Sequence, residues 1–303
     1  MHDVVPQAEL LALLEASGIG ETASDGAPPA EPVGTDDCSI TPTAVKGVWL
    51  AQTTDFFYPL VDDPYVMGKI ACANVLSDLY AVGVVHCDTM LMLLGVSTQL
   101  ADSDVRRVAT TLCMRGFRDL AAAAGTRVTG GQTVRNPWYL VGGVASAVVA
   151  EAQLIRPVNA LPGDVLAVAS MARLNQNAAK LMHKYGAHAA TDVTGFGLLG
   201  HASNLAAGQD ASVDFVIHTM PLLPHALALD KVTCFGLDAG KSPETSGGLL
   251  VALPADVAAP FLEELSRLDG WSGCVVGDVV EGTGKARLLA PDQLTFRTIE
   301  CVL

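Results

Sequence analysis

The sequence predicts a mixed protein of α/β and α+β type that is built in two halves. Strand-like and helix-like segments alternate along its 303 residues. Half of the residues are hydrophobic and 17% are charged, which is typical of a folded globular chain. A Pro-Gly-Asp turn at residues 162–164 precedes a second series of strands, so we place the division between the halves near residues 160–170.

The elements follow from the periodicity of apolar residues. A short opening helix at about 6–16 and a linker at 19–35, rich in Gly, Pro and Ala, come first. The first half then predicts strands at 48–54, 89–96 and 138–150, and helices at 64–81 and 103–124. The second half predicts strands at 165–169, 213–218, 248–253 and 274–280, and helices at 171–185 and 255–268. We therefore expect three regions, at residues 1–34, 35–158 and 159–303.

Composition excludes several classes of function. The net charge of −14 disfavours a nucleic-acid partner, which attracts basic proteins. No apolar run approaches the ~18 residues that span a bilayer, and the first residues do not resemble a secretory signal, so we expect no membrane association. The seven cysteines include no C-x-x-C pair. Free thiols in a reducing cytoplasm are therefore expected.

Two stretches resemble phosphate-binding loops and fail on inspection. GLDAGKS, at 236–242, has three residues between its glycines where a P-loop needs four, and PETSGG after it predicts a turn where a P-loop has a helix. GFGLLG, at 195–200, fits G-x-G-x-x-G, but AATDVT before it lacks the Val- and Ile-rich strand of a dinucleotide fold. We assign neither as a nucleotide site.

The carboxylates of residues 52–79 fall into two groups. Asp62 and Asp63 precede Pro64 and a helical run, which predicts helix capping. Asp78 lies four residues after Asn74 on a helix that is apolar almost all round, so both side chains are expected to be buried on one face. A buried carboxylate needs a partner, and a metal ion is one candidate.

Further acidic residues stand at the ends of other elements. Asp55 ends a strand, the Asp36–Asp37 pair precedes one, and Asp192 stands before a Gly-rich turn into a helix. Oxygen ligands of this kind suit Mg²⁺ that bridges to phosphates. Taken singly, each aspartate is explained equally well by capping or solvation. GGQT, at 130–133, offers either backbone donors for an anion or a tight turn between strands.

Longer motifs carry a resemblance to a known family. These are TTDFFYPLVDDPYVMGKIACANVLSDLYAVGV, LMLLGVS, TGGQT, MARLNQNAAKLMH, HAATDVTGFGLLGH and PETSGGLL. In this order they closely resemble selenophosphate synthetase (selenide, water dikinase) of the eukaryotic type, from about residue 35 to near the C-terminus. The wider superfamily includes aminoimidazole ribonucleotide synthetase.

The resemblance implies a two-domain aminoimidazole ribonucleotide synthetase-like fold. An N-terminal ATP- and Mg²⁺-binding domain would pair its strands with those of a second copy in a homodimer, and a C-terminal α+β domain would follow. The implied reaction converts ATP, selenide and water into selenophosphate, AMP and orthophosphate, with Mg²⁺ and usually K⁺. The implied metal ligands are Asp36, Asp37, Asp55, Asp78 and Asp192, with Asp36 favoured within its pair. The implied nucleotide contacts are Gly34, Thr35, Asp36, Thr53, Thr54, Asp55, Asp78, Gly130, Gly131, Gln132 and Thr133.

Two departures from the family qualify this expectation. The family carries a Cys or selenocysteine closely followed by a Lys near its N-terminus, whereas Lys46 is the first lysine here and Cys38 does not match the position. The chain thus resembles an N-terminally shortened form with impaired turnover, and no residue takes the catalytic role. A longer family segment is also missing between Ser170 and Met171. A non-catalytic regulatory relative, or another ATP-dependent synthetase of the superfamily, remain the alternatives.

Overall fold

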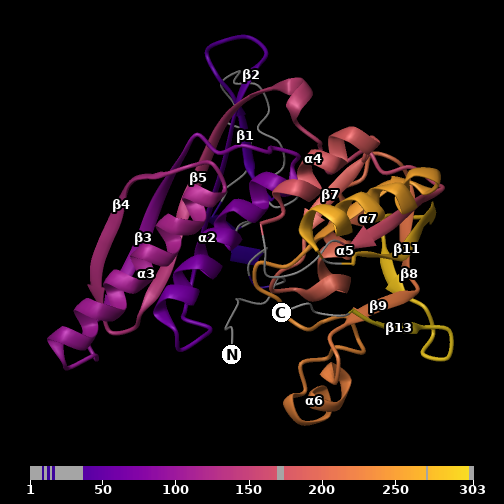
Figure 1. Cartoon of the computed structure of the whole chain (residues 1–303). Helices are drawn as coiled ribbons and strands as arrows, with labels where there is room; N and C mark the ends of the chain where they lie inside the picture. Colours follow the sequence, from indigo (N-terminus) through magenta and orange to yellow (C-terminus); the bar gives the residue numbers. More distant parts are fainter. Residues whose placement is uncertain are drawn as a thin grey trace.

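The computed structural model describes residues 37–168, 174–270 and 272–299, together with five helical positions between 9 and 17. The rest of the predicted opening helix, and the linker, lie outside the described residues. Figure 1 shows two β-sheets side by side, each carrying helices, with the first half of the chain on one side and the second half on the other. The predicted mixture of strands and helices in two series is confirmed.

The first half is a five-stranded sheet in the order β1-β2-β5-β3-β4, with two helices packed on one face (Figure 1). Strands β3 and β4 are parallel, and the other pairs are antiparallel. All five predicted elements are present, and β1 is the strand expected after the Asp36–Asp37 pair, whereas β4 was not predicted. The elements are β1 Ser39–Pro42, β2 Val48–Phe57, α2 Pro64–Ala81, β3 Thr89–Ser97, α3 Ser103–Ala123, β4 Val128–Asn136 and β5 Leu140–Ala150.

Helix α2 is the central element of this half. Asp63 caps it as predicted, because its carboxylate accepts hydrogen bonds from the N–H groups of Tyr65 (2.8 Å) and Val66 (3.1 Å). Its neighbour α3 lies in backbone contact. A Cβ atom on Gly68 would stand 2.0 Å from the carbonyl oxygen of Cys113, and one on Gly116 would stand 1.9 Å from that of Tyr65. Glycine at both positions therefore permits this close packing.

The second half is a six-stranded sheet in the order β12-β8-β11-β6-β10-β7. Helices α4 and α7 join one hydrophobic core and α5 joins the other, so the sheet is covered on both faces. A small parallel pair, β9 with β13, and the exposed helix α6 extend from this body (Figure 1). The elements are η1 Glu151–Gln153, β6 Asp164–Val168, α4 Gln176–Tyr185, β7 Ala189–Asp192, α5 Gly197–Ala207, β8 Val213–Ile217, β9 Thr219–Leu222, α6 Ala226–Thr233, β10 Leu249–Pro254, α7 Ala255–Asp269, β11 Cys274–Glu281, β12 Ala286–Leu288 and β13 Thr295–Thr298.

Three sequence predictions need correction. AATD, in which we expected no strand, forms β7 by pairing with β10, and its four residues are buried. The helix predicted at 171–185 begins at Gln176, and the described residues 174 and 175 precede it. The alternative of a tight turn for GGQT is wrong, because Gly130–Thr133 lies inside β4 and pairs with β3.

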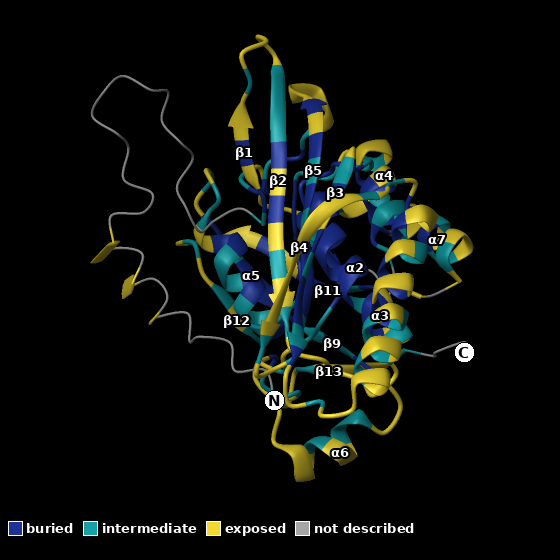
Figure 2. Cartoon of the chain, turned by 90° about the vertical axis from the view of Figure 1, so that its left-hand side faces the viewer, coloured by how far each residue is buried: buried dark blue, intermediate teal, exposed yellow. Residues whose placement is uncertain are grey.

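The two halves share one hydrophobic core. It contains apolar residues of α2 and α3 from the first half together with residues of α4, α7 and β10 from the second. Figure 2 shows this buried interior, with α2 dark blue near the centre, the largely exposed β4 facing the viewer and α3 to one side. Within the described residues, no helix combines the length and apolar character needed to cross a membrane.

Candidate functional site

Four aspartates from distant parts of the chain meet where the two halves join. Asp55 lies on β2, Asp78 on α2 and Asp192 at the end of β7, and Asp37 precedes β1. Electrostatic repulsion from Asp192, Asp37 and Asp55 reaches Asp78 and helps to raise its pKa. Asp37 is tied to the second half, because the hydroxyl of Thr191 donates to its Oδ1 at 3.1 Å. The structure therefore brings together the predicted carboxylates that it describes.

Strand alternation decides which threonine joins this cluster. Thr53 is buried and its hydroxyl donates to Oδ2 of Asp78. Thr54, the next residue, is exposed. Because successive side chains of a strand point to opposite faces, Thr54 lies on the face of the sheet away from α2. Only one of the two predicted nucleotide-contacting threonines thus reaches the carboxylates within one chain.

Asn74, one helical turn before Asp78 on α2, holds Asp55 in place. Its Nδ2 donates to Oδ2 of Asp55, and its Oδ1 accepts a 2.8 Å hydrogen bond from the N–H of Ser246. The hydroxyl of Ser246 in turn donates to the carbonyl of Ile70 at 3.0 Å. Ser246 adopts a left-handed φ of 50°, which only a few per cent of non-glycine residues do. The turn PETSGG is therefore fastened directly to the helix that carries Asp78.

Asp192 carries the clearest sign of an absent partner. Its residue is 3% exposed, and its Oδ2 has no hydrogen-bond partner. Nearby, Nδ2 of Asn175 donates to the hydroxyl of Ser77 at 3.0 Å and to the carbonyl of Gly247 at 2.8 Å. Buried polar atoms without a partner are rare in folded proteins, and one at a candidate site indicates a ligand or an ion.

The electrostatics of the cluster fit a cation. Burial raises the pKa of Asp55 to about 6, against opposing hydrogen bonds from the Phe56 backbone and Asn74. Burial, with repulsion from Asp55, raises the pKa of Asp192 to about 6 despite a hydrogen bond with Ser77. Burial and then its acidic neighbours raise the pKa of Asp78 well above the ordinary value. Carboxylates in this state gain from any positive charge placed among them.

The donor set is that of a hard divalent ion. Carboxylate oxygens, with threonine and asparagine beside them, are the ligands that Mg²⁺ and Ca²⁺ prefer. Among the described His, Cys, Asp and Glu side chains, no group of three or more is placed so that it could hold a metal ion by itself. The four aspartates are thus within electrostatic reach of one another without forming a complete cage, which suits an ion whose remaining ligands come from a substrate or water.

The predicted nucleotide segment Gly130–Thr133 lies elsewhere. It occupies β4, the edge strand, which is separated from β2 by β5 and β3. Three strand spacings correspond to about 14 Å, so it does not reach Asp55 within one chain. It lines an open cavity of about 560 Å³ together with Arg115 and Arg118 of α3. Gly34, Thr35 and Asp36, the remaining predicted contacts, lie outside the described residues.

Several residues of this region were not predicted from sequence. Ser77, Asn175 and Ser246 supply the hydrogen bonds described above. Ser77 lies in a largely apolar helix, while Asn175 and Ser246 lie in the motifs MARLNQNAAKLMH and PETSGGLL. Glu244, in the same PETSGG turn, has an Oε2 atom without a partner, and burial raises its pKa to about 7. His201 is buried and accepts a hydrogen bond from the N–H of Thr194 at 3.0 Å, which is a structural role.

Two family models match successive parts of the chain. Residues 35–149 match the family model "AIR synthase related protein, N-terminal domain", and residues 139–289 match "AIR synthase related protein, C-terminal domain". A Dictyostelium discoideum protein named "Selenide, water dikinase" is 44% identical, covering 91% of this chain and 84% of its own length. The human "Selenide, water dikinase 2" is 45% identical, covering 86% of this chain and 68% of its own.

Solved structures agree on the fold. AaThiL complexed with AMPPCP and TMP has a TM-score of 0.70 at 16% identity, covering 93% of both chains. Hydrogenase maturation protein HypE in complex with ATP has a TM-score of 0.64 at 18% identity, covering 79% of this chain and 81% of that one. At such identities the likeness shows the fold alone. The predicted two-domain fold of the aminoimidazole ribonucleotide synthetase type is confirmed.

Proposed function

Because the chain belongs to the selenide, water dikinase family, we propose that it makes selenophosphate from selenide, ATP and water, releasing AMP and orthophosphate. The observation that carries this proposal is the group of buried aspartates contributed by both halves. A purely structural cluster of this kind would be self-repelling, whereas a phosphoryl-transfer site needs acidic residues to hold the ions that accompany ATP.

Mg²⁺ would be held by Asp37, Asp55, Asp78 and Asp192, with Asp36 as the proposed fifth ligand. The orphaned Oδ2 of Asp192 and the raised pKa of its neighbours support this assignment. When bound, Mg²⁺ supplies the charge neutralisation that lets a triphosphate approach carboxylates. We include K⁺ in the same proposal because the resemblance to the family implies it.

The chain's own residues position these ligands. Thr53 donates to Oδ2 of Asp78 and Asn74 donates to Oδ2 of Asp55, so hydrogen bonds fix the orientation of both carboxylates. The Ser246 N–H orients the Asn74 amide so that its NH₂ group faces Asp55. Because positioning and charge neutralisation dominate phosphoryl transfer, a fixed orientation of these oxygens is the main contribution of the protein.

The nucleotide would lie between two copies of the chain. Thr53 stands at the carboxylates, while Thr54 and Gly130–Thr133 lie on the outer face and the far edge of the same sheet. The face carrying Thr54 also exposes Phe56, Leu91 and Val148, and β4 is exposed along its length. A homodimer formed through this sheet would cover the apolar side chains and bring Gly130–Thr133 of one copy to the carboxylates of the other.

Two finer assignments accompany this proposal. The domain limits are residues 35–158 for the ATP- and Mg²⁺-binding domain and 159–303 for the C-terminal domain, with residues 1–34 before them. The six described cysteines without a disulfide, five of them buried, support a reducing compartment, and we propose the cytoplasm.

The function is tested by following ATP with and without selenide under anaerobic conditions. We expect AMP to form in the presence of Mg²⁺ only when selenide is added, with selenophosphate detected by ³¹P NMR. Because no residue here matches the Cys or selenocysteine and the Lys of the family's N-terminal segment, we expect turnover to be slow, and a version that carries that segment should turn over faster. AMP release that does not depend on selenide, or the formation of ADP as the final product, would contradict the dikinase assignment.

A further inference from the structure

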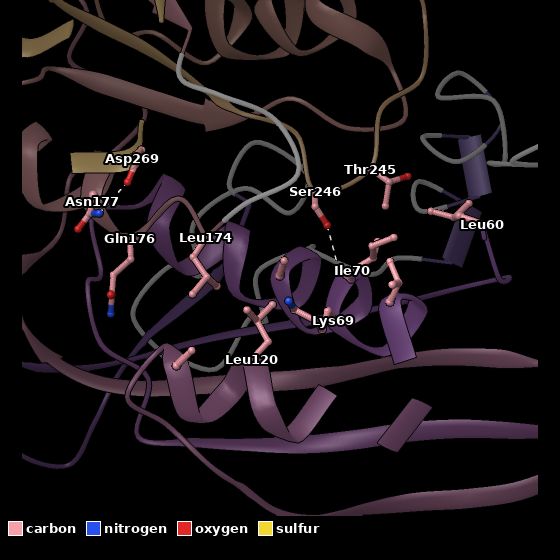
Figure 3. A pocket seen from close by; sticks show the side chains of 13 residues that line it. Leu60, Lys69, Ile70, Leu120, Leu174, Gln176, Asn177, Thr245, Ser246 and Asp269 are labelled. Atoms are coloured by element: carbon pink, nitrogen blue, oxygen red, sulfur yellow. Dashed lines mark hydrogen bonds between the residues drawn. The ribbon is translucent and has the colours of Figure 1, made fainter. Parts of the chain in front are cut away.

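A second cavity lies on a neighbouring face of α2, apart from the four aspartates. Its volume is about 770 Å³, within the range of roughly 300–1,000 Å³ that small-molecule sites occupy. It opens between α2 and α3 of the first half and α4, α7 and the turn at 245–246 of the second. Figure 3 shows Lys69 and Ile70 of α2 and Leu120 of α3 along its wall, with Asn177 and Asp269 at one end.

The cavity is held open by hydrogen bonds between the halves. Nε2 of Gln176 donates to the carbonyls of Val85 (2.9 Å) and Ala124 (3.2 Å) on one side. On another side, Ser246 donates to the carbonyl of Ile70 (Figure 3). Because both halves are fastened at the rim, the space is a fixed feature of the junction. A space of this size at a fastened junction is large enough to hold a small molecule.

Seven of the thirteen residues that line the cavity are apolar, and Lys69 is the only cation among them. Leu60 and Val66 are 39% and 41% exposed, so apolar side chains at the cavity remain uncovered. Lys69 is exposed and makes no ion pair with any described side chain. Asp269, the one carboxylate in the lining, accepts from Nδ2 of Asn177 at 2.7 Å. An ammonium group beside apolar walls favours an anion with an apolar body.

We propose that this cavity binds a small organic monoanion whose apolar body packs against Ile70, Leu120 and Leu174 while its charge meets Lys69. A nucleoside triphosphate does not fit this chemistry, because one lysine cannot balance its charge and the lining offers one carboxylate for a metal ion. The site is therefore distinct from the proposed nucleotide site and takes a different class of ligand.

Two fluorescent probes test the proposal, because they share an apolar body and differ in charge. These are 8-anilinonaphthalene-1-sulfonate, an anion, and N-phenyl-1-naphthylamine, which is neutral. We expect one high-affinity site for the anion. Lys69→Met should lower the affinity for the anion at least fivefold and leave the affinity for the neutral probe within twofold of wild type. Lys46→Met, at an exposed lysine outside the cavity, should change neither affinity.

A filling variant locates the site. Ala123→Trp places a large side chain in the cavity and should lower the affinity for both probes at least tenfold. Ala122→Trp, at an exposed neighbour that does not line the cavity, should leave both affinities unchanged. Urea unfolding of each variant checks that the fold is kept. Three results would each overturn the proposal. These are equal binding of the anion by Lys69→Met and wild type, equal effects of the two tryptophan variants, and displacement of the anion by Mg²⁺ and ATP.

Discussion

At the scale of single residues, aspartates of one short segment take different roles because their surroundings differ. Asp63 is exposed and accepts two backbone N–H groups at the start of α2, where it stabilises the helix. Asp78, on the same helix, is enclosed with three other carboxylates, and its pKa is raised. Asp63 therefore stabilises the fold. Asp78 destabilises it, and its burial is accounted for only by a ligand.

The stability of the metal-free protein should therefore fall as pH rises. A carboxylate whose pKa is raised in the folded state binds its proton more tightly there than in the unfolded chain, so its favourable contribution is present at low pH and is lost above the folded pKa. For Asp55 and Asp192 that value is about 6. Asp78→Asn removes one repelling charge, so it should raise the free energy of unfolding more at pH 8, where the neighbouring carboxylates are ionised, than at pH 5.

Urea unfolding with EDTA, at pH 5 and at pH 8, measures this effect. Asp62→Asn, at an exposed aspartate in the loop before the helix, is the matched control and should change neither value. If Asp78→Asn is less stable than wild type at pH 8 without metal, Asp78 is a structural residue and the account of the cluster is wrong.

Asn74 should be required for the junction between the halves. Asn74→Leu keeps a similar volume but leaves Asp55 without its donor and the buried N–H of Ser246 without its acceptor. Each lost partner costs about 1–3 kcal/mol, so we expect a loss of at least about 2 kcal/mol in the free energy of unfolding. An unfolding midpoint equal to that of wild type would show that these hydrogen bonds do not fasten the turn.

Part of this residue-level arrangement could be predicted from sequence. The four-residue spacing placed Asn74 and Asp78 on one face of a buried helix, and both do face the cluster. The partner of Asn74 in the second half could not be predicted, because Ser246 lies 172 residues beyond Asn74, and a single sequence holds no signal for a contact over that distance.

At the scale of elements, two of the strands that were not predicted, β7 and β4, have few typical strand residues. The residues of β7 are Ala, Ala, Thr and Asp, and it is a strand because β10 supplies its hydrogen bonds. Strand β4 contains Gly-Gly and was interpreted as a loop or turn, yet it is an exposed edge strand paired in parallel with β3. Tertiary pairing overrides local preference in both cases.

The two glycines of β4 have different roles: strand packing requires Gly131, whereas Gly130 has room for a side chain. Gly131 has φ +142°, and a Cβ atom there would stand 1.9 Å from the carbonyl oxygen of Met92, whereas one on Gly130 would meet only the end of the Leu91 side chain at 3.4 Å. Gly131→Ala should therefore destabilise the protein by about 2 kcal/mol or more. Gly130→Ala should leave the free energy of unfolding within about 0.5 kcal/mol of wild type.

Thermal unfolding by circular dichroism distinguishes these variants. With the fold retained, Gly130→Ala also reports on the proposed nucleotide contact through its affinity for ATP. Similar melting temperatures for the two variants would contradict the assignment of Gly131 to strand packing.

At the scale of the whole molecule, the uncovered face of the first sheet indicates a partner. Phe56 is 58% exposed and Val148 is 50% exposed on that face, while α2 and α3 cover the other. For the proposed homodimer, Val148→Lys should shift the protein to a monomer in sedimentation-velocity experiments and should also lower the affinity for ATP, because the site would lack β4 of the second copy.

A charge placed on another exposed apolar residue is the control. Val232 of α6 is 83% exposed and lies in the second half, so Val232→Lys should leave the mass in solution unchanged. A wild-type protein that sediments as a monomer at micromolar concentration, or a dimer that survives Val148→Lys, would contradict the proposed interface.

The central claim is that carboxylates from both halves hold ATP through divalent ions, and calorimetric titration of ATP tests it most directly. Wild type and Asp62→Asn should bind ATP with Mg²⁺ present and lose that binding in EDTA. Asp78→Asn, from the first half, and Asp192→Asn, from the second, should each weaken binding at least tenfold. ATP binding that is independent of Mg²⁺, or that is unchanged in both variants, would contradict the account.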